Sequence, residues 1–480
     1  MSEQKLTAVL EKTLQRISQE AGLVGGALSV VKGGEIIYTY NYGYADRENQ
    51  IPYTQDTLCD VASTSKAWTV MLAAKAIDEG LIDGWTTPIK QYIPELELMN
   101  NPYGTENLSI RDMASHRTGV PAHDMIREKL HINREALMRK LAVLEPNDGF
   151  RTRYQYNNLF FVLLGYLEER VRGGMPWEDQ IVEYIAKPLG VDQIRFRGID
   201  ENMDQVNPAL PYGANGHTSK LCSYFADRYT APCGGIRISM KNMSKWVIAM
   251  ARGGVTESGE RLCSEKQFKE IITPVISTPA QEYFHMKNVG YAQGWLNGNY
   301  KGSTVLYHTG GHTGFNTMVS FVPGQDCGFC VCFNTGSTPA HRITQAIVLD
   351  YLLTGDVEDS YDHMIDAWCR DRDAMRAKLS KYEQGTPVTV ESHPGLVGTY
   401  FHPGYETFEI KEGDGGKLVF EYGSLVAEIR IEEGGVMSAY NGVLDALTPI
   451  GVVLEQKENG DMLLEHPDTY GLVITFTKEN

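Results

Sequence analysis

Residues 58–80 read LCDVASTSKAWTVMLAAKAIDEG, and this stretch decides how the rest of the chain is interpreted. From Ala62 to Ile77 the stretch is largely apolar and contains no proline or glycine, which predicts a helix. Ser63 and Lys66 are three residues apart, so a helix places them on one face, about 5–6 Å apart at Cβ. A serine hydroxyl is a weak nucleophile near pH 7 unless a base lies beside it. The spacing therefore predicts a nucleophile paired with an amine.

A second copy of the same spacing shows why the local structure matters. Ser29 and Lys32 lie in GGALSVVKGGEIIYTY (25–40), where the alternation around Gly33 and Gly34 predicts a β-hairpin. In a strand, residues three apart point to opposite faces of the sheet. Ser29 is therefore predicted to be structural.

Two further stretches complete the pattern. Tyr156-Asn157-Asn158 precedes LFFVLLGYLEERV (159–171), which predicts an amphipathic helix. His308-Thr309-Gly310-Gly311 follows STVLY (303–307) and precedes GFNTMVSFVPG (314–324), so it is predicted at a strand edge. The order SxxK, YxN and then H/K-T-G resembles the serine β-lactamase and penicillin-binding-protein superfamily, in the class C-like branch that includes D-aminopeptidases, carboxylesterases and acyltransferases. Segments such as GYADRENQIPYTQDT (43–57) and LSIRDMASHRTGVP (108–121) extend the resemblance to about residues 5–355.

The resemblance implies roles for individual residues. Ser63 would be the nucleophile that forms an acyl-enzyme, and Lys66 would assist its deprotonation. Tyr156 would share acid and base work with Lys66 and protonate the leaving group, with Tyr154 as a weaker competitor. Asn158 would bond Lys66 or the acyl-side carbonyl of the substrate. The oxyanion would be held by the backbone N–H groups of Ser63 and Gly311.

The HTG stretch departs from the penicillin-directed pattern, which usually has lysine at its first position. His308 is expected to be largely neutral near pH 7 and to gain a proton below about pH 6. Amides, D-amino-acid derivatives or esters are therefore favoured over classical β-lactams. Thr309, Gly310 and Gly311 are candidate substrate contacts, and His312 is expected in a loop at the rim of the pocket. His116 is predicted to belong to a buried structural turn.

Composition excludes several functions. A net charge of −17 provides no clustered cations for nucleic acid or for anionic membranes. No run approaches the ~20 apolar residues needed to cross a bilayer. MSEQKLTAVLEKTLQRISQEAG (1–22) predicts a charged amphipathic helix rather than a signal peptide, so a cytoplasmic location is expected. We expect a small-molecule or peptide substrate, and the sequence leaves a homo-oligomer open.

The eight cysteines indicate neither a disulfide framework nor a metal site. Cys327, Cys330 and Cys332 include a CxxC, but they lie in a predicted core strand, and no second pair with zinc spacing accompanies them. Buried free thiols are predicted, with neither a metal nor another cofactor.

The predicted fold is α/β (α+β), an antiparallel sheet flanked by helices with an all-helical subdomain at about 63–200. The serine hydrolase-like domain is expected over 1–356, with a charged helical linker at 357–390. Short alternating strands separated by glycine and asparagine turns predict a small all-β domain at 391–480, which resembles a lipocalin-like barrel. That domain shows no catalytic constellation, and its histidines, including His402, are predicted to be turn or surface residues. The irregular stretch 200–232 is expected to border the binding site.

The sequence leaves three functions open. The first is a serine hydrolase that releases its acyl group to water, and the second is an acyltransferase that passes it to an amine or alcohol with the same residues. The third is a binding protein on this fold, which the intact Ser63, Lys66, Tyr156 and His308 argue against.

Overall fold

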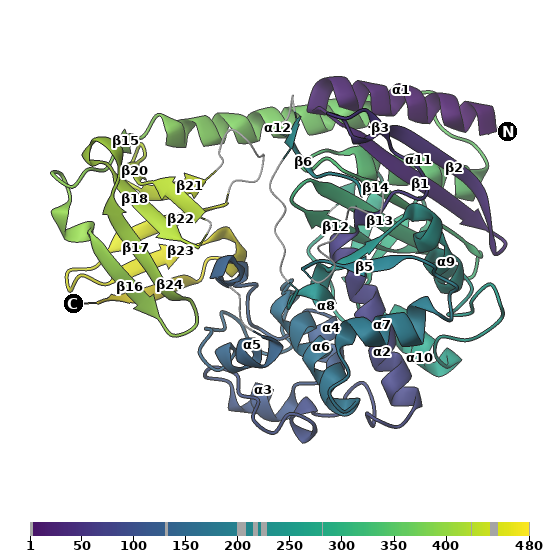
Figure 1. Cartoon of the computed structure of the whole chain (residues 1–480), viewed down its shortest axis with the longest axis horizontal. Coiled ribbons are helices and arrows are strands. Elements are labelled where there is room, and N and C mark those ends of the chain that lie inside the picture. Colours follow the sequence, from purple (N-terminus) through teal and green to yellow (C-terminus); the bar gives the residue numbers. More distant parts are fainter. Residues whose placement is uncertain are drawn as a thin grey trace.

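The structure, a computed structural model, describes residues 3–129, 133–198, 208–214, 219–221, 228–280, 282–423, 425–441 and 450–479. An antiparallel nine-stranded sheet lies between helices, a helical region adjoins it, and a nearly closed ten-stranded barrel follows at the C-terminus (Figure 1). This confirms the predicted fold class. Residues up to 354 are called the main unit below, and residues 386–478 are called the barrel.

The large sheet has its central strands buried on both faces. Its order is β3-β2-β1-β14-β13-β12-β11-β10-β9, so the N-terminal hairpin pairs with the last strand of the main unit. Along β1, Leu28 and Val30 face one hydrophobic cluster, while Ala27 and Val31 face another. Successive side chains alternate across a strand, so one strand supplies both cores. The strands of this sheet are β1 (Gly25–Lys32), β2 (Glu35–Asp46), β3 (Ile51–Pro52), β9 (Glu282–Tyr283), β10 (Met286–Tyr291), β11 (Leu296–Tyr300), β12 (Ser303–His312), β13 (Phe315–Val322) and β14 (Cys327–Phe333).

Helices cover both faces of this sheet. Helices α1 (Glu3–Ala21) and α11 (Ala340–Thr354) pack on one face, and α9 (Met240–Ala251) packs on the other. The helical region lies on the α9 side, around α2 (Lys66–Asp78) and α6 (Leu159–Val171) (Figure 1). Its remaining elements include α3 (Pro102–Asn107), α4 (Ile110–Ala114), η3 (Asp124–Lys129), α5 (Arg134–Lys140), α7 (Trp177–Ile181), α8 (Ala231–Gly234), α10 (Glu265–Ile272), and the small sheet of β4 (Cys59–Asp60), β8 (Ile236–Ile238) and β5 (Ile194–Phe196).

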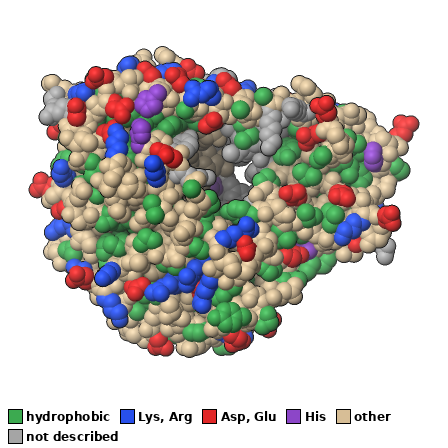
Figure 2. Space-filling model, turned by 180° about the vertical axis from the view of Figure 1, so that it is seen from behind, with side chains coloured by type: hydrophobic (Ala, Val, Ile, Leu, Met, Phe, Trp, Pro, Cys, Tyr) green, Lys and Arg blue, Asp and Glu red, His purple; other side chains and the backbone are tan. Residues whose placement is uncertain are grey.

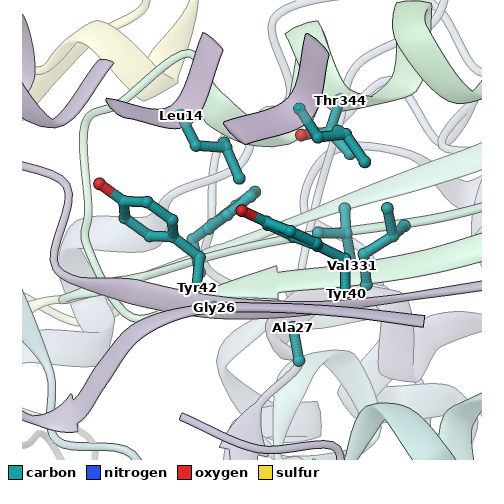
Figure 3. A pocket seen from close by; sticks show the side chains of 10 residues that line it. Leu14, Gly26, Ala27, Tyr40, Tyr42, Val331 and Thr344 are labelled. Carbon is teal, nitrogen blue, oxygen red and sulfur yellow. The ribbon is translucent and has the colours of Figure 1, made fainter. Parts of the chain in front are cut away.

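A small apolar cavity lies between α1 and the outer face of the large sheet. Leu14, Tyr40, Val331 and Thr344 line it, and Figure 3 shows the rings of Tyr40 and Tyr42 on the side of the sheet that faces the helices. Its volume of about 10 Å³ is room for about one water molecule. The cavity is therefore a packing defect rather than a substrate site.

A long helix joins the main unit to the barrel. Helix α12 (Asp362–Glu383) runs along the top of the view in Figure 1, and Arg16 of α1 forms an ion pair with Asp362 at 2.8 Å. The barrel order is β15-β20-β21-β22-β23-β24-β16-β17-β18-β19. Its strands are β15 (Thr386–Pro387), β16 (Gly398–His402), β17 (Glu406–Glu412), β18 (Leu418–Tyr422), β19 (Leu425–Glu428), β20 (Arg430–Ile431), β21 (Met437–Asn441), β22 (Ile450–Gln456), β23 (Met462–Glu465) and β24 (Val473–Lys478).

Several local predictions can be checked. The hydroxyl of Ser29 donates to Gln55 Oε1 at 2.7 Å within the core, so this serine is structural, as predicted. The described cysteines are free, and all but the partly exposed Cys369 are buried. Most of the irregular stretch 200–232, with Cys222, lies outside the described residues. Among the helices described, we find none that combines the length and the apolar character of a membrane span.

Candidate active site

Ser63 lies in a turn of 3-10 helix rather than in the α-helix that the sequence predicts. The 3-10 helix η1 covers Ala62–Ser65, and α2 begins at Lys66. Asp60 Oδ1 accepts the Ala62 N–H at 2.9 Å, and Ala62 has φ of 46°, in the left-handed region. The Val61 N–H bonds Ile236 of β8 at 3.1 Å. These contacts fix the chain before the nucleophile and tighten the first turn.

Lys66 is held by three acceptors around its amine. Nζ lies 3.1 Å from Ser63 Oγ, 2.8 Å from Asn158 Oδ1 and 2.7 Å from the Cys233 carbonyl oxygen. The side chain is fully buried, whereas Ser63 is partly exposed. A carbonyl oxygen can only accept, so two N–H bonds point at Asn158 and Cys233. In the ammonium form the third N–H points at Ser63 Oγ, and in the neutral amine the lone pair at that position takes the Ser63 proton.

Tyr156 lies beside Lys66 and Ser63. Its ring centre is 4.8 Å from Lys66 Nζ, and its hydroxyl is near enough to Ser63 for that residue to oppose the rise in its pKa. The loop that carries it is tied down by Asn157, whose Nδ2 donates to the Pro121 carbonyl at 2.6 Å and whose Oδ1 accepts the Leu159 N–H at 2.7 Å. Tyr156 therefore sits at the entrance of α6, as predicted.

The HTG stretch is part of β12, and His308 is more enclosed than the sequence suggests. It is 3% exposed, with Nε2 2.8 Å from the Tyr291 hydroxyl and Nδ1 2.6 Å from the Thr309 carbonyl. Both nitrogens are thus occupied within the protein. His312 ends β12, paired with Phe315, rather than lying in a loop. Its Nδ1 is 3.9 Å from the buried carboxylate of Asp60.

Thr309, Gly310 and Gly311 run past the nucleophile turn. A Cβ added at Gly310 would lie 2.2 Å from the Val61 carbonyl oxygen, so only glycine allows the strand to approach this closely. A Cβ at Gly311 would meet nothing within 4 Å. Thr309 is partly exposed, and Gly311 is exposed. The strand edge therefore has open space at Gly311, two residues beyond Thr309.

Burial and charge fix the protonation of the neighbouring groups. Burial, and after it the positive charge of protonated Lys66, lower the pKa of His308 to about 3. The same two causes place the pKa of His116 well below its ordinary value. The expectation that His308 gains a proton below about pH 6 is therefore wrong. Burial raises the pKa of Tyr156 well above its ordinary value, although pairing with Ser63 opposes this, so the phenol is neutral at pH 7.

Three contributors were missed from the sequence. Asp124 accepts from Asn158 Nδ2 with both carboxylate oxygens at 3.0 Å, and so orients the amide that holds Lys66. Tyr291 holds His308. Cys233 contributes only a backbone carbonyl. None of these belongs to a motif, and only Tyr291 is close in sequence to the group it holds.

His116 is buried, as predicted, and supports the site. Its Nδ1 accepts the Asn157 N–H at 3.0 Å, and its ring packs on that of Tyr156 with centroids 4.3 Å apart. His116 itself has φ of 58°, so it turns the chain in the left-handed region. It fixes the backbone next to Tyr156 and is not a proton donor to the reacting atoms.

The described residues contain no group of three or more His, Cys, Asp or Glu side chains arranged to hold a metal ion. The chemistry that this arrangement can do is nucleophilic. A partly exposed hydroxyl has a buried amine as its proton acceptor and a neutral phenol beside it, and an open strand edge lies next to it. Attack on a carbonyl carbon is the reaction that uses all four features.

Comparison with known proteins agrees with this chemistry. The family model described as Beta-lactamase matches residues 10–352. The unguisins hydrolase ungD' of Aspergillus campestris is 26% identical over 432 residues, which cover 85% of this chain and 77% of that protein.

Solved structures share the fold at lower identity. The octameric penicillin-binding protein homologue from Pyrococcus abyssi has a TM-score of 0.62 and 19% identity, and the alignment covers 99% of this chain and 100% of that one. The barrel therefore belongs to the shared architecture. The D-amino acid amidase from Ochrobactrum anthropi SV3 has a TM-score of 0.60 and 19% identity, over 74% of this chain and 99% of that one.

Proposed function

This chain belongs to the Beta-lactamase family of serine hydrolases, and from this premise we propose that it cleaves amide or ester bonds of small molecules or peptides through an acyl-enzyme on Ser63. The observation that carries the proposal is the contact of 3.1 Å between Ser63 Oγ and Lys66 Nζ. Two N–H groups of the same amine are bound by the oxygens of Asn158 and Cys233.

The reaction begins with transfer of the Ser63 proton to Lys66 as Oγ attacks the substrate carbonyl carbon. The oxyanion that forms is placed at the backbone N–H groups of Ser63 and Gly311. Collapse breaks the bond to the leaving group, and Tyr156 gives its proton to the leaving nitrogen or oxygen. The Tyr156 phenolate then recovers a proton from Lys66, which returns the pair to its starting state. Water attacks the acyl-enzyme by the same route in reverse and frees Ser63.

The substrate class we propose is a D-amino-acid amide or peptide, or a neutral carboxylic ester. Two observations support this choice over a classical β-lactam. His308 is buried and neutral, so β12 offers no cation at that position to a carboxylate on the substrate. A relative 26% identical to this chain is named a hydrolase of unguisins, whereas the D-amino acid amidase and a class C β-lactamase share the fold equally well and favour neither substrate.

Intact-protein mass spectrometry tests the proposal. The enzyme is incubated with a panel of activated esters, D- and L-amino-acid amides and β-lactams, with the variant Ser63→Ala as the matched control. We expect an added acyl mass on the wild type, mapped to Ser63, and turnover of D-amides or neutral esters above β-lactams. An adduct on another serine, or normal turnover by Ser63→Ala, would refute the assignment.

A further inference from the structure

The barrel touches the main unit next to the residues that hold Lys66. The Tyr405 hydroxyl, in the turn between β16 and β17, lies 2.6 Å from His123 Nδ1. On a second segment, Asn147 Nδ2 donates to the Thr469 carbonyl at 3.0 Å. In Figure 1 the barrel stands beside the helical region near α5, and Figure 2 shows the surface hollowed between the barrel and the main unit. The barrel is therefore docked at the site's edge as well as joined through α12.

The ring of His123 is held at both nitrogens. Nε2 lies 2.9 Å from the Glu145 carbonyl oxygen, which can only accept, so Nε2 carries a proton. In the neutral imidazole, Nδ1 is then the acceptor, and the Tyr405 hydroxyl donates to it. His123 is fully buried and has φ of 49°. A non-glycine residue in this region is strained, so the two ring bonds hold a backbone conformation that the chain would otherwise leave.

The residue after His123 is Asp124, the first residue of η3. Its carboxylate accepts from Asn158 Nδ2, and Asn158 Oδ1 accepts from Lys66 Nζ at 2.8 Å. A continuous series of contacts thus leads from the barrel to the amine beside the nucleophile. Each step is a hydrogen bond, except the single backbone link between His123 and Asp124.

We propose that Tyr405 is a positioning residue for catalysis, through which the barrel fixes Asp124 and thereby the Asn158 amide that aims Lys66 at Ser63. The inference rests on the proposed function, because it assigns a role in the acylation step. The barrel then contributes to bond breaking without contacting the reacting atoms. Loss of the Tyr405 hydroxyl removes its hydrogen bond to His123 Nδ1 and loosens the strained turn before Asp124.

Other contacts between the barrel and the main unit do not involve the side chain of His123. Lys140 Nζ donates to the Gly404 carbonyl at 3.0 Å and to Glu406 at 2.7 Å, and His402 Nε2 lies 2.9 Å from Glu145 Oε1. The prediction of a surface position for His402 is therefore wrong, since it is buried against the main unit, whereas the predicted turn role agrees with its Nδ1 accepting the N–H groups of Gly404 and Tyr405. Of these residues, His402 also accepts the Tyr405 N–H, so Lys140 is the one whose replacement weakens docking and leaves the side chains of Tyr405 and His123 without a lost partner.

The test compares Tyr405→Phe with Tyr400→Phe in the full chain. Tyr400 is also fully buried in the barrel, and its hydroxyl donates to the Leu396 carbonyl at 2.7 Å, inside the barrel. Both variants lose one buried hydroxyl, but only the first loses a bond to the main unit. Lys140→Met is the docking control. The measurements are kcat and KM for a small activated ester, and thermal unfolding to confirm folding.

For Tyr405→Phe we expect kcat to fall about 5-fold, the equivalent of one hydrogen bond, with KM changed less than about 2-fold. Tyr400→Phe and Lys140→Met should keep kcat within about 2-fold. If Tyr405 acts through Asp124, Tyr405→Phe combined with Asp124→Asn should lose little more than Asp124→Asn alone. Should Tyr405→Phe fold poorly, His123→Gln breaks the same bond from the other side and should give the same fall in kcat.

Equal kcat for Tyr405→Phe and Tyr400→Phe would overturn the inference, as would fully multiplicative losses in the double variant. Failure of the proposed function gives a different result. In that case Ser63→Ala retains activity, whatever the Tyr405 variant does. If kcat falls as much in Lys140→Met as in Tyr405→Phe, the loss of kcat comes from weaker docking of the barrel alone, and the inference about Tyr405 is also overturned.

Discussion

Glu168 on α6 should make the protein less stable as the pH rises. Its side chain is fully buried, and neither carboxylate oxygen has a hydrogen-bond partner among the described residues. Burial raises the pKa of Glu168 to about 8 from an ordinary 4.5, although the charge of Arg172 opposes the shift. The unfolded chain therefore releases a proton that the folded chain retains. The variant Glu168→Gln removes this titration with little change in shape.

The size of the change in stability follows from the raised pKa of Glu168. A raised pKa stabilises the fold fully below about pH 4.5, and this contribution is lost as the pH rises through about 8. The rise of the Glu168 pKa from 4.5 to about 8 corresponds to about 5 kcal/mol, at about 1.4 kcal/mol for each tenfold change in proton affinity. Glu168→Gln should therefore match the wild type within about 1 kcal/mol at pH 5 and exceed it by several kcal/mol at pH 9.

Urea unfolding at pH 5 and pH 9, followed by tryptophan fluorescence, measures the difference. Glu97→Gln is the control, because Glu97 is exposed and its replacement should change stability by less than about 1 kcal/mol at either pH. The reasoning is refuted if the difference in unfolding free energy between Glu168→Gln and the wild type is the same at pH 9 as at pH 5. It would mean that Glu168 is ionised and paired in the fold.

The other predictions concern the site. Lys66→Ala and Tyr156→Phe should each lower kcat by at least ~10²-fold in ester hydrolysis, and the double variant should lose far less than the product; multiplicative losses would mean independent roles. In Gly310→Ala the new Cβ would lie 2.2 Å from the Val61 carbonyl oxygen, so the variant should displace that carbonyl and slow fluorophosphonate labelling of Ser63. Labelling at the wild-type rate would show that the strand edge can shift. The ratio of kcat/KM for a penicillin to that for a neutral ester should stay constant between pH 8 and pH 5, because the pKa of His308 is about 3; a rise toward pH 5 would show that a cation forms near the substrate carboxylate.

The fold was predictable where the pattern is local. Alternation around Gly33 and Gly34 indicates the hairpin of β1 and β2, and continuous apolar residues indicate α2 and α6. The turn at Ser63 was harder, because η1 depends on Asp60 accepting the Ala62 N–H and on Val61 pairing with β8. Tertiary bonds of this kind override helix propensity at the end of an element. The α-helix was therefore predicted from Ala62, whereas α2 begins four residues later, at Lys66.

The site was predictable where the chemistry has a fixed spacing. Ser63 and Lys66 stand out because three residues separate them, and the contact of Asn158 with Lys66 was also anticipated and is confirmed. Asp124 could not be found, since its partner is 34 residues away and a single aspartate has no pattern. The burial of His402 was missed for the same reason, because its partner Glu145 is 257 residues distant. Contacts between separate units leave no periodic signal.

The Tyr405–His123 and His402–Glu145 contacts bear on how such a barrel can be inherited. A module that hangs on a linker alone can be exchanged between relatives without matching changes elsewhere. Here each contact joins one residue of the barrel to one residue of the helical region, so the two residues of each contact must change together. A chimera that exchanges the barrel alone would place an unmatched side chain against buried His123 and against half-buried Glu145. The barrel and the helical region are thus expected to diverge as a matched pair, with compensating substitutions across their boundary.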